Sequence, residues 1–205
     1  MKKRQPYHHG NLKHALLDAS LGLIREIGVG AFTLREVARR AGVSHNAPYR
    51  HFRNKEELLA AVAAEGFDRL TESMTKAAQP GFNALDRLHL SGRGYVQFAL
   101  SHPQHFAVMF DAPGGFDSYP ETRAAGERAF GTLVRYIRDC QGEGCLPKGD
   151  WSPLALLAWS MVHGVAKLAL SGRLPFSKAA RVLQFTDMAT EALRLGMANM
   201  SSSIV

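Results

Sequence analysis

Residues 33–55, TLREVARRAGVSHNAPYRHFRNK, constrain the fold of this chain more than any other stretch. Apolar residues in the first half recur at the spacing of one helix face, namely Leu34, Val37, Ala38 and Ala41. Thr33 is a suitable N-cap for this helix, and Gly42 has the backbone freedom to end it. Ser44 can cap a second helix directly after the turn. The pattern predicts a helix-turn-helix whose second helix projects outward.

The side chains expected to project from the second helix are polar or basic. Donors of this kind bind the phosphates and base edges of DNA. We expect Arg35, Ser44, Tyr49, His51 and Lys55 to fix register on phosphates, and His45, Asn46 and Arg50 to read bases. Thr33 and Ala47 complete the predicted DNA-binding set. Lys2, Lys3 and Arg4 form a basic arm that either follows DNA or is disordered without it.

Positive charge is concentrated in the same region. Residues 1–55 contain 11 Lys and Arg against 3 Asp and Glu, whereas residues 56–205 contain 14 against 15. The formal net charge of +7 therefore arises in the first quarter of the chain. This asymmetry favours a polyanionic partner over the alternative, a helical hairpin with a solvated arginine face.

The stretch from residue 16 to residue 59 carries a family resemblance. Its motifs TLREVARRAGVS and KEELL, with Tyr49, His51 and Phe52, resemble the DNA-binding domain of TetR-family transcriptional regulators. Asn46 stands where glycine is frequent in that family, and Pro48 where an aliphatic residue usually packs inward. We expect the helix to persist, because a proline in the first turn forfeits at most about one backbone hydrogen bond. Asn46 can pair with adenine, so the base preference should differ from that of a relative with glycine.

Helical periodicity continues along the chain without convincing strand alternation, which predicts an all-α protein. Helices are expected at residues 11–27, 54–78, 84–101, 103–111, 121–141, 154–170 and 178–197. Residues 1–55 are predicted to form a three-helix DNA-binding domain, and residues 80–200 a C-terminal effector-binding and dimerisation domain. The helix at 54–78, with Asn54 and Glu57 as a capping box, connects the two. The resemblance implies that this helix carries the effector signal.

The last two expected helices supply the predicted assembly surface. Residues 154–170, with Ser152 as N-cap and Pro153 in the first turn, are apolar on nearly all sides and need cover on all sides. We expect these helices to form half of a four-helix bundle that a second subunit completes. A homodimer sets two recognition helices about 34 Å apart, which matches successive major grooves. The alternative is burial of both helices within one subunit.

No segment predicts a membrane span or a secretory signal. The longest largely apolar run, residues 154–166, is shorter than the roughly 18 residues that cross a bilayer. The N-terminal residues MKKRQPYHHG are basic but lack the apolar stretch of a signal peptide. We therefore expect a cytoplasmic protein.

The segments HPQHFAVMF and WSMVHGVAKLAL resemble the C-terminal WHG-type domain of some TetR-like regulators. That resemblance implies an effector-binding and dimerising region. The expected pocket is apolar and adaptable, with His163 as a polar contact. Its predicted lining is Phe98, Phe106, Met109, Phe110, Trp159, Met161 and His163. The alternative for each of these residues is an ordinary place in the core.

Other reactive residues give weaker signals. Cys140 and Cys145 are expected to be reduced, with a redox switch as the alternative. His102 and His105 are spaced to reach one metal ion, but no nearby ligand completes a set, so no metal or cofactor is expected. No nucleophile elbow, phosphate loop or carboxylate pair is present, which argues against an enzyme.

Together these features predict a sequence-specific transcriptional regulator, a repressor of the TetR type, that binds a palindromic operator in double-stranded DNA. A small apolar effector in the C-terminal domain is expected to relieve operator binding. The alternative is a constitutive or architectural DNA-binding protein without an effector, because a core and a pocket look alike in sequence.

Overall fold

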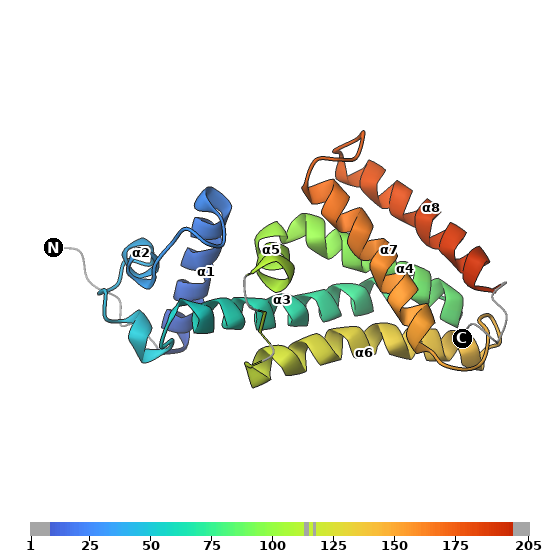
Figure 1. The fold of residues 1–205 in the computed structure, drawn as a ribbon, viewed down its shortest axis with the longest axis horizontal. Helices are drawn as coiled ribbons and strands as arrows, with labels where there is room; N and C mark the ends of the chain where they lie inside the picture. The colour runs from blue at the N-terminus through green and yellow to red at the C-terminus, as the bar shows by residue number, and fades with distance from the viewer. Residues whose placement is uncertain (1–8, 113–114, 117, 199–205) are drawn as a thin grey trace. The chain divides into compact units, whose positions relative to one another are not determined.

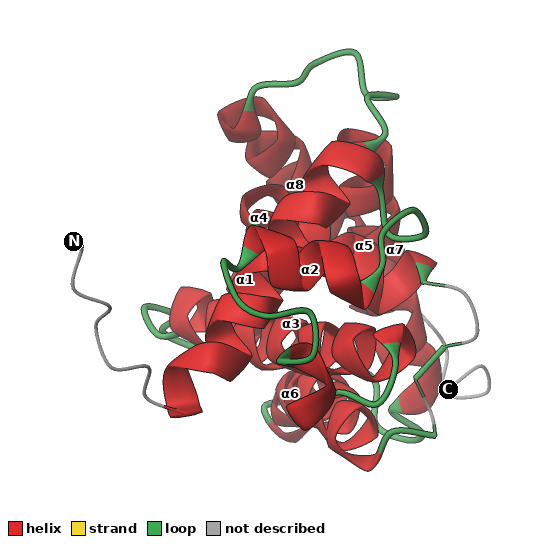
Figure 2. Ribbon diagram, turned by 90° about the vertical axis from the view of Figure 1, so that its left-hand side faces the viewer, coloured by secondary structure: helices red, strands yellow, loops and turns green. Residues whose placement is uncertain are grey.

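The computed structural model describes residues 9–112, 115–116 and 118–198. Within these ranges the chain consists of helices and loops and contains no strand (Figure 2). The elements along the chain are α1 (His9–Ile27), α2 (Leu34–Arg40), the 3-10 turn η1 (Pro48–Arg50), α3 (Lys55–Ala78), α4 (Ala84–Ser101), α5 (Pro103–Asp111), α6 (Pro120–Gly142), α7 (Ser152–Leu170) and α8 (Ala179–Ala198) (Figure 1). The all-α prediction is confirmed. The predicted basic arm lies outside the described residues.

The chain divides into two compact units. The first contains residues 1–65 and 104–123, and the second contains residues 66–103 and 124–205. The division falls inside α3, whose residues therefore belong to both units. The limits differ from the predicted domains at 1–55 and 80–200, which rest on sequence motifs rather than on contacts and stay a prediction.

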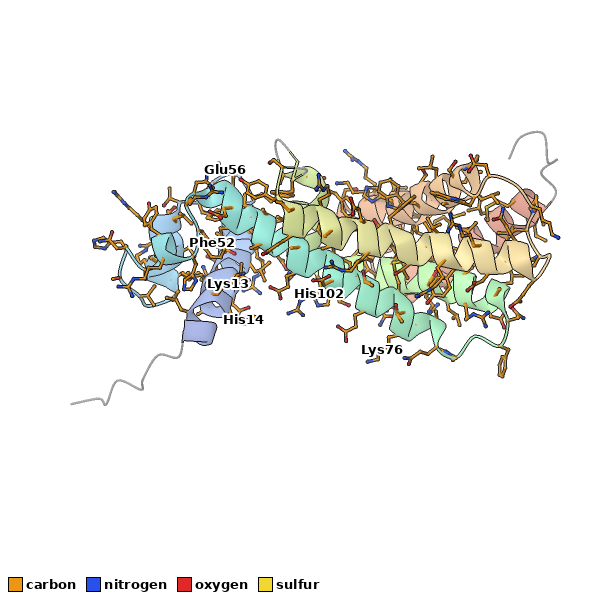
Figure 3. The ribbon with its side chains drawn as sticks, turned by 90° about the horizontal axis from the view of Figure 1, so that it is seen from below. Lys13, His14, Phe52, Glu56, Lys76 and His102 are labelled. Atoms are coloured by element: carbon orange, nitrogen blue, oxygen red, sulfur yellow. The ribbon has the colours of Figure 1, made fainter. Side chains whose placement is uncertain are left out.

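The first unit is built around the N-terminal helices. Residues on one face of α1, α2 and the start of α3 are almost fully buried, and these are Leu16, Val37, Ala38, Leu58 and Val62. Helix α1 packs on α2, as expected of a helix that braces the helix-turn-helix. Ile27 is an exception to the predicted α1 stripe, because it is 47% exposed next to the glycine that ends the helix. Lys13 and His14 of α1 are exposed (Figure 3).

Helix α3 begins after an asparagine cap. The Asn54 Oδ1 atom accepts from the Glu57 N–H at 2.8 Å, which confirms the predicted cap. The reciprocal bond differs from a capping box, since the Glu57 carboxylate accepts from the Arg53 N–H at 2.6 Å instead of from the cap residue. Glu56 is exposed in the first turn (Figure 3).

The second unit packs α4 against α7 and α8, which also contact each other. Helix α4 approaches the second half of α3 closely at Gly94. A Cβ atom there would lie 2.7 Å from the Ser73 carbonyl oxygen, and the Ser73 hydroxyl donates to the Gly94 carbonyl at 2.9 Å. Only a residue without a side chain fits this close approach.

Helix α7 starts differently from the prediction. Its N-cap is Trp151, without a side-chain hydrogen bond, and Ser152 is the first helical residue. The Ser152 N–H and hydroxyl instead donate to the two carboxylate oxygens of Asp150, at 2.9 and 2.6 Å. Asp150 thus satisfies one of the N–H groups that have no partner within the helix in its first turn.

Helix α7 is also a better candidate for a membrane span than the sequence analysis indicated. In the described part of the chain it is the one helix long and apolar enough, by length and composition, to cross a membrane. The estimate counted residues 154–166, whereas the helix runs over Ser152–Leu170. Only 33% of its most apolar window is buried within the chain. The core helix of a soluble protein meets the same criteria, so this is weak evidence for a membrane.

Candidate functional site

The helix-turn-helix begins with a well-capped helix. The Thr33 hydroxyl accepts from the Glu36 N–H at 3.3 Å, and the Glu36 carboxylate accepts from the Thr33 N–H at 2.7 Å. These reciprocal bonds form a capping box on α2. The Thr33 hydroxyl also donates to the Glu36 carboxylate at 2.9 Å, and this bond, together with the one from the Thr33 N–H, lowers the pKa of Glu36 below its usual value of 4.5 because both favour the charged carboxylate. Thr33 therefore acts as the predicted N-cap.

The turn after α2 is closed by backbone hydrogen bonds. Gly42 has a φ of +69°, and its N–H donates to the Arg39 carbonyl at 3.2 Å. The Val43 N–H donates to the Ala38 carbonyl at 3.0 Å. This pair of bonds is a Schellman motif, and it requires a residue that tolerates positive φ. The predicted role of Gly42 is confirmed.

The segment that follows the turn corrects a prediction. In place of an α-helix from Ser44, the structure has a three-residue 3-10 turn, Pro48–Arg50, with Ala47 as its N-cap and no side-chain cap bond. Bonds between residues three apart, from Ala47 to Ser44 and from His51 to Pro48, replace most of the α-helical pattern. Pro48 has no N–H to donate to the Ser44 carbonyl, although Ala47 before it keeps helical dihedral angles. The missing hydrogen bond therefore disrupts this short helix more than we expected.

The predicted DNA-binding residues nonetheless share one exposed stretch. Ser44, His45, Asn46, Tyr49 and Arg50 are exposed, while Ala47 and His51 are half-buried. Tyr49 exposes 52% of its surface, which is unusual for a large aromatic side chain. Pro48 and Phe52 are buried beneath this stretch and hold it on the first unit. Polar and aromatic groups are thus available to a partner of the first unit.

Two basic residues of the region are held by contacts within the first unit. The Lys55 Nζ donates to the Gly30 carbonyl at 2.8 Å and lies 4.4 Å from the centre of the Phe32 ring. The Arg40 guanidinium makes a paired contact with the Glu26 carboxylate, at 2.6 and 2.7 Å. That bond lowers the pKa of Glu26. Arg35, Arg39 and Arg50 remain exposed, so the surface around the turn stays basic.

The second unit contains a cluster of aromatic and polar side chains from α4, α6 and α7. The Tyr95 hydroxyl lies 2.8 Å from His163 Nδ1 and accepts from Trp159 Nε1 at 3.4 Å. Because the indole N–H can only donate, the tyrosine hydrogen is available to His163 Nδ1. Phe130 meets the Trp159 ring edge-on, with centroids 5.9 Å apart. Burial raises the pKa of Tyr95, so this phenol stays protonated.

The predicted pocket residues fall into both compact units. Phe106, Met109 and Phe110 lie on α5 in the first unit, where the Phe106 and Phe110 rings pack with centroids 4.8 Å apart. Phe98, Trp159, Met161 and His163 lie in the second unit. Within that unit Trp159 and His163 are brought together, whereas Phe98 stacks on His102 at 5.2 Å. Their role in a pocket stays a prediction.

Sequence reasoning missed Tyr95 and Phe130 as neighbours of Trp159. The spacing of Tyr95 along α4 places its ring on the apolar side of that helix, but its hydroxyl is what meets His163 and Trp159. A buried tyrosine needs a polar partner, and that requirement was the available signal. Among the described residues, no group of three or more His, Cys, Asp or Glu side chains is arranged to hold a metal ion.

The fold and the exposed basic turn define an all-α protein with an N-terminal helix-turn-helix. Residues 88–193 match the family model for the tetracyclin repressor-like C-terminal domain, and residues 16–62 match the model for bacterial regulatory proteins of the tetR family. The chain belongs to the TetR family, a family of transcriptional regulators that bind DNA.

Individual relatives agree with this assignment. The chain is 43% identical over 63 residues to the tetracycline repressor protein class A from transposon 1721 of Escherichia coli, a match that covers 31% of this chain and 26% of that protein. The chain spans less than half the length of the curated relatives it matches. A solved structure of a Rhodococcus sp. RHA1 protein of unknown function is 36% identical, with a TM-score of 0.81 over 96% of this chain and 100% of that one.

A more distant solved structure shares the fold. FadR from Bacillus subtilis, in complex with stearoyl-CoA, is 16% identical, with a TM-score of 0.76 over 89% of this chain and 98% of that one. At this identity the similarity concerns the arrangement of helices alone.

Proposed function

We propose that the protein is a ligand-responsive repressor of transcription that binds a palindromic operator through residues 44–51. The observation that carries this proposal is the exposed polar and basic stretch held behind a capped α2 by the Gly42 turn. The dense positive charge of residues 1–55 supports a polyanionic partner. Two of the relatives that the chain resembles, the tetracycline repressor protein class A and KstR of Rhodococcus jostii, are named as repressors, which supports the same role here.

Within this stretch the residues divide by the contacts they can make. Asn46 and His45 lie in the exposed turn before Pro48, where an amide can pair with adenine and an imidazole with a base edge. Arg50 is exposed on η1 and can reach a guanine. Arg35, Ser44, Tyr49 and His51 contact phosphates in this proposal. Lys55 contributes a positive charge while it holds the loop before α2 through Gly30.

The effector site is proposed to lie in the second unit, at the cluster of Tyr95, Phe130, Trp159 and His163. Aromatic faces there suit an apolar ligand, and the histidine and tyrosine suit a polar group on it. The FadR neighbour binds stearoyl-CoA, which supports an effector with a long apolar chain. Effector binding changes operator affinity through α3, whose residues belong to both units. A swing from mostly bound to mostly free takes about 5 kcal/mol of differential affinity.

A homodimer through α7 and α8 is proposed as the form that binds DNA. Leucines that the chain leaves exposed on α7 mark the interface, and these are Leu156, Leu157, Leu168 and Leu170. Met188 and Leu195 on α8 are also exposed, at 64% and 50%. Helix α7 is apolar on nearly all sides, yet only 33% of its most apolar window is buried within the chain. A second copy would cover this surface, and this supports our proposal that the protein is cytoplasmic.

The proposal is tested by selection from a random DNA pool at two salt concentrations, followed by sequencing of the bound fraction. Enrichment of a palindrome, with affinity that falls steeply as salt rises, is expected of a dimeric sequence reader. Salt-dependent binding without any enriched site would overturn it in favour of the architectural alternative.

The proposed effector site is tested by a second measurement. A thermal shift with acyl-CoA compounds of increasing chain length is expected to raise the melting temperature, since a ligand of the folded state stabilises it. The matched control is Tyr95→Phe, which keeps the ring but removes the hydroxyl. If every compound shifts the melting temperature of the wild type and of Tyr95→Phe by the same amount, the ligand binds away from this cluster.

A further inference from the structure

The C-terminal end of α6 brings together the two cysteines of the chain. Gly144 has a φ of +76°, and its N–H donates to the Gln141 carbonyl at 3.3 Å. The Cys145 N–H donates to the Cys140 carbonyl at 2.9 Å. These bonds form a Schellman motif, which frequently brings the side chains at the first and last positions of the turn into contact. Here those positions are Cys140 and Cys145.

The same motif ends α2 and α7 without this chemistry. The bond that spans the turn runs from Val43 to Ala38 after α2 and from Arg173 to Leu168 after α7. A Schellman motif therefore places no demand for sulfur on these positions, and an apolar or mixed contact closes it equally well. Two thiols at such a contact add a capacity for covalent bonding that the other two turns lack.

The two thiols differ in their surroundings. Cys140 is fully buried, and burial raises the pKa of its thiol, with a smaller rise from the neighbouring Cys145. Cys145 is half-buried, and its Sγ lies 3.2 Å from the Cys140 carbonyl oxygen, to which its S–H donates. Arg194 of α8 interacts electrostatically with Cys145. Cys145 is thus the more accessible of the two thiols, and oxidants reach an accessible cysteine before a buried one.

We propose that Cys140 and Cys145 form an oxidation site for hydroperoxides, in which the half-buried Cys145 reacts first and the buried Cys140 completes an intrachain disulfide. With hydrogen peroxide, the deprotonated Cys145 sulfur attacks one peroxide oxygen, the O–O bond breaks, and Cys145 becomes a sulfenic acid, while the leaving hydroxide takes up the proton that the Cys145 thiol released and becomes water. The Cys140 sulfur then attacks the Cys145 sulfur, the S–O bond breaks, and the hydroxyl leaves with the Cys140 proton as water. Both sulfurs are oxidised by one unit, both peroxide oxygens are reduced by one unit, and two waters form.

The disulfide would constrain a contact between α6 and α4. Glu143 lies between the two cysteines, and its carboxylate accepts from the Ala84 N–H at 2.9 Å and from Arg87 Nη2 at 3.1 Å. These bonds hold the first turn of α4 against the end of α6. A ring closed around Glu143 restricts the loop that carries this contact.

The test treats the reduced, full-length protein with one equivalent of hydrogen peroxide and follows the tryptic peptide DCQGEGCLPK, residues 139–148. That peptide contains both cysteines and no methionine, so its mass reports on the thiols alone. The expected result is loss of two hydrogen atoms from the peptide, reversed by dithiothreitol, with no covalent dimer on a non-reducing gel. A peptide that stays unchanged, or a protein that instead becomes a covalent dimer, would overturn the proposal.

Single variants separate the roles of the two thiols. Cys145→Ala is expected to slow peroxide consumption by about tenfold or more, because the remaining thiol is buried. Cys140→Ala is expected to react at close to the wild-type rate and to leave a sulfenic acid that dimedone captures; Cys140→Ser is a second variant should the alanine fail to fold. The reverse pattern would contradict the assignment.

The role of the charge is tested with a matched pair on α8. Arg194 is ion-paired with Glu191, with Nε at 2.8 Å from the carboxylate. Arg194→Gln removes the cation and is expected to slow the first step several-fold. A nearby cation stabilises the negative charge on the attacking sulfur, and solvent screens part of that effect. Glu191→Gln removes the partner but keeps the cation, and is expected to leave the rate unchanged or faster. Equal slowing by both variants would show a structural effect of α8 instead of a charge effect.

Discussion

Helices α2 and α7 use their apolar residues in opposite ways. Helix α2 has seven residues and buries Leu34, Val37 and Ala38 while its arginines stay on the outer face. Helix α7 has 19 residues, and leucines on its surface remain up to 50% exposed. The apolar face of α2 finds its partner inside the chain, whereas α7 has more apolar surface than the chain can cover. An amphipathic pattern thus locates a helix in its own core, whereas an apolar helix that its own chain leaves partly exposed is where we propose a partner subunit.

The largest expected effect comes from the buried side of α2. Leu34→Ala removes a side chain that is 6% exposed, and we expect a loss of stability of about 3 kcal/mol from lost burial and the cavity that remains. Chemical denaturation followed by circular dichroism measures it. The control is Arg35→Ala on the exposed side of the same helix, expected to change stability by less than about 0.5 kcal/mol. Similar losses in both variants would remove the distinction between the two faces.

A substitution on the exposed surface of α7 should weaken dimerisation rather than folding. Leu157→Glu places a charge on an apolar side chain that is 41% exposed, and we expect the dimer to dissociate at least about 30-fold more readily, or about 2 kcal/mol. Sedimentation over a range of concentrations measures this change. Phe82→Glu is the matched control, because Phe82 is 97% exposed and lies outside α7 and α8. If Leu157→Glu dimerises with the same dissociation constant as the wild type, the interface lies elsewhere.

A substitution in the exposed turn after α2 should change the specificity for DNA sequence. Asn46→Ala is expected to lose about 1–3 kcal/mol of discrimination at one or two base pairs, because the amide no longer pairs with a base. Binding to a series of operator variants measures it. The counterpart is Lys55→Ala, expected to weaken all sequences alike, to lower the salt slope by about 1 and also to lower the melting temperature through the lost Gly30 contact. Identical losses across the operator series for Asn46→Ala would exclude base reading at this position.

The smallest effect concerns the cap of α2 and its pH dependence. The Thr33 bonds keep the folded-state pKa of Glu36 below 4.5, so its contribution to stability is present above that pH and is lost as the pH falls through the folded-state value. The melting temperature of Glu36→Gln should therefore lie below that of the wild type near neutral pH and approach it in acid. Glu56→Gln, at an exposed position of α3, is the control. A gap that widens on acidification would contradict this sign.

The sequence was most informative where local chemistry decides structure. The observed bounds of α4 and α5, Ala84–Ser101 and Pro103–Asp111, equal the predicted ones, because an asparagine precedes the first and a proline begins the second. The helix after Gly42 could not be predicted in the same way. One proline in a segment of about two turns removes a bond that a longer helix would not miss, so the short helix becomes a 3-10 turn. The α-helix prediction there was wrong.

The candidate ligand cluster required the tertiary structure. Tyr95, Phe130 and His163 come from α4, α6 and α7, and no spacing along the sequence predicts that they meet. The cysteines at 140 and 145 are an intermediate case. Their separation and the glycine between them are visible in the sequence, but only the backbone bonds at the end of α6 show that the turn closes.

The sequence by itself determined the helical class, the capped α2 with its glycine turn, the basic N-terminal quarter and the family. These depend on residues within a few positions of one another, where helix periodicity, capping and positive φ act locally. The tertiary structure decided which polar groups meet, which basic side chains are held by Gly30 and Glu26, and which leucines of α7 stay uncovered. Those outcomes depend on how surfaces from distant segments fit together, and packing between helices is not encoded in the spacing of any one of them.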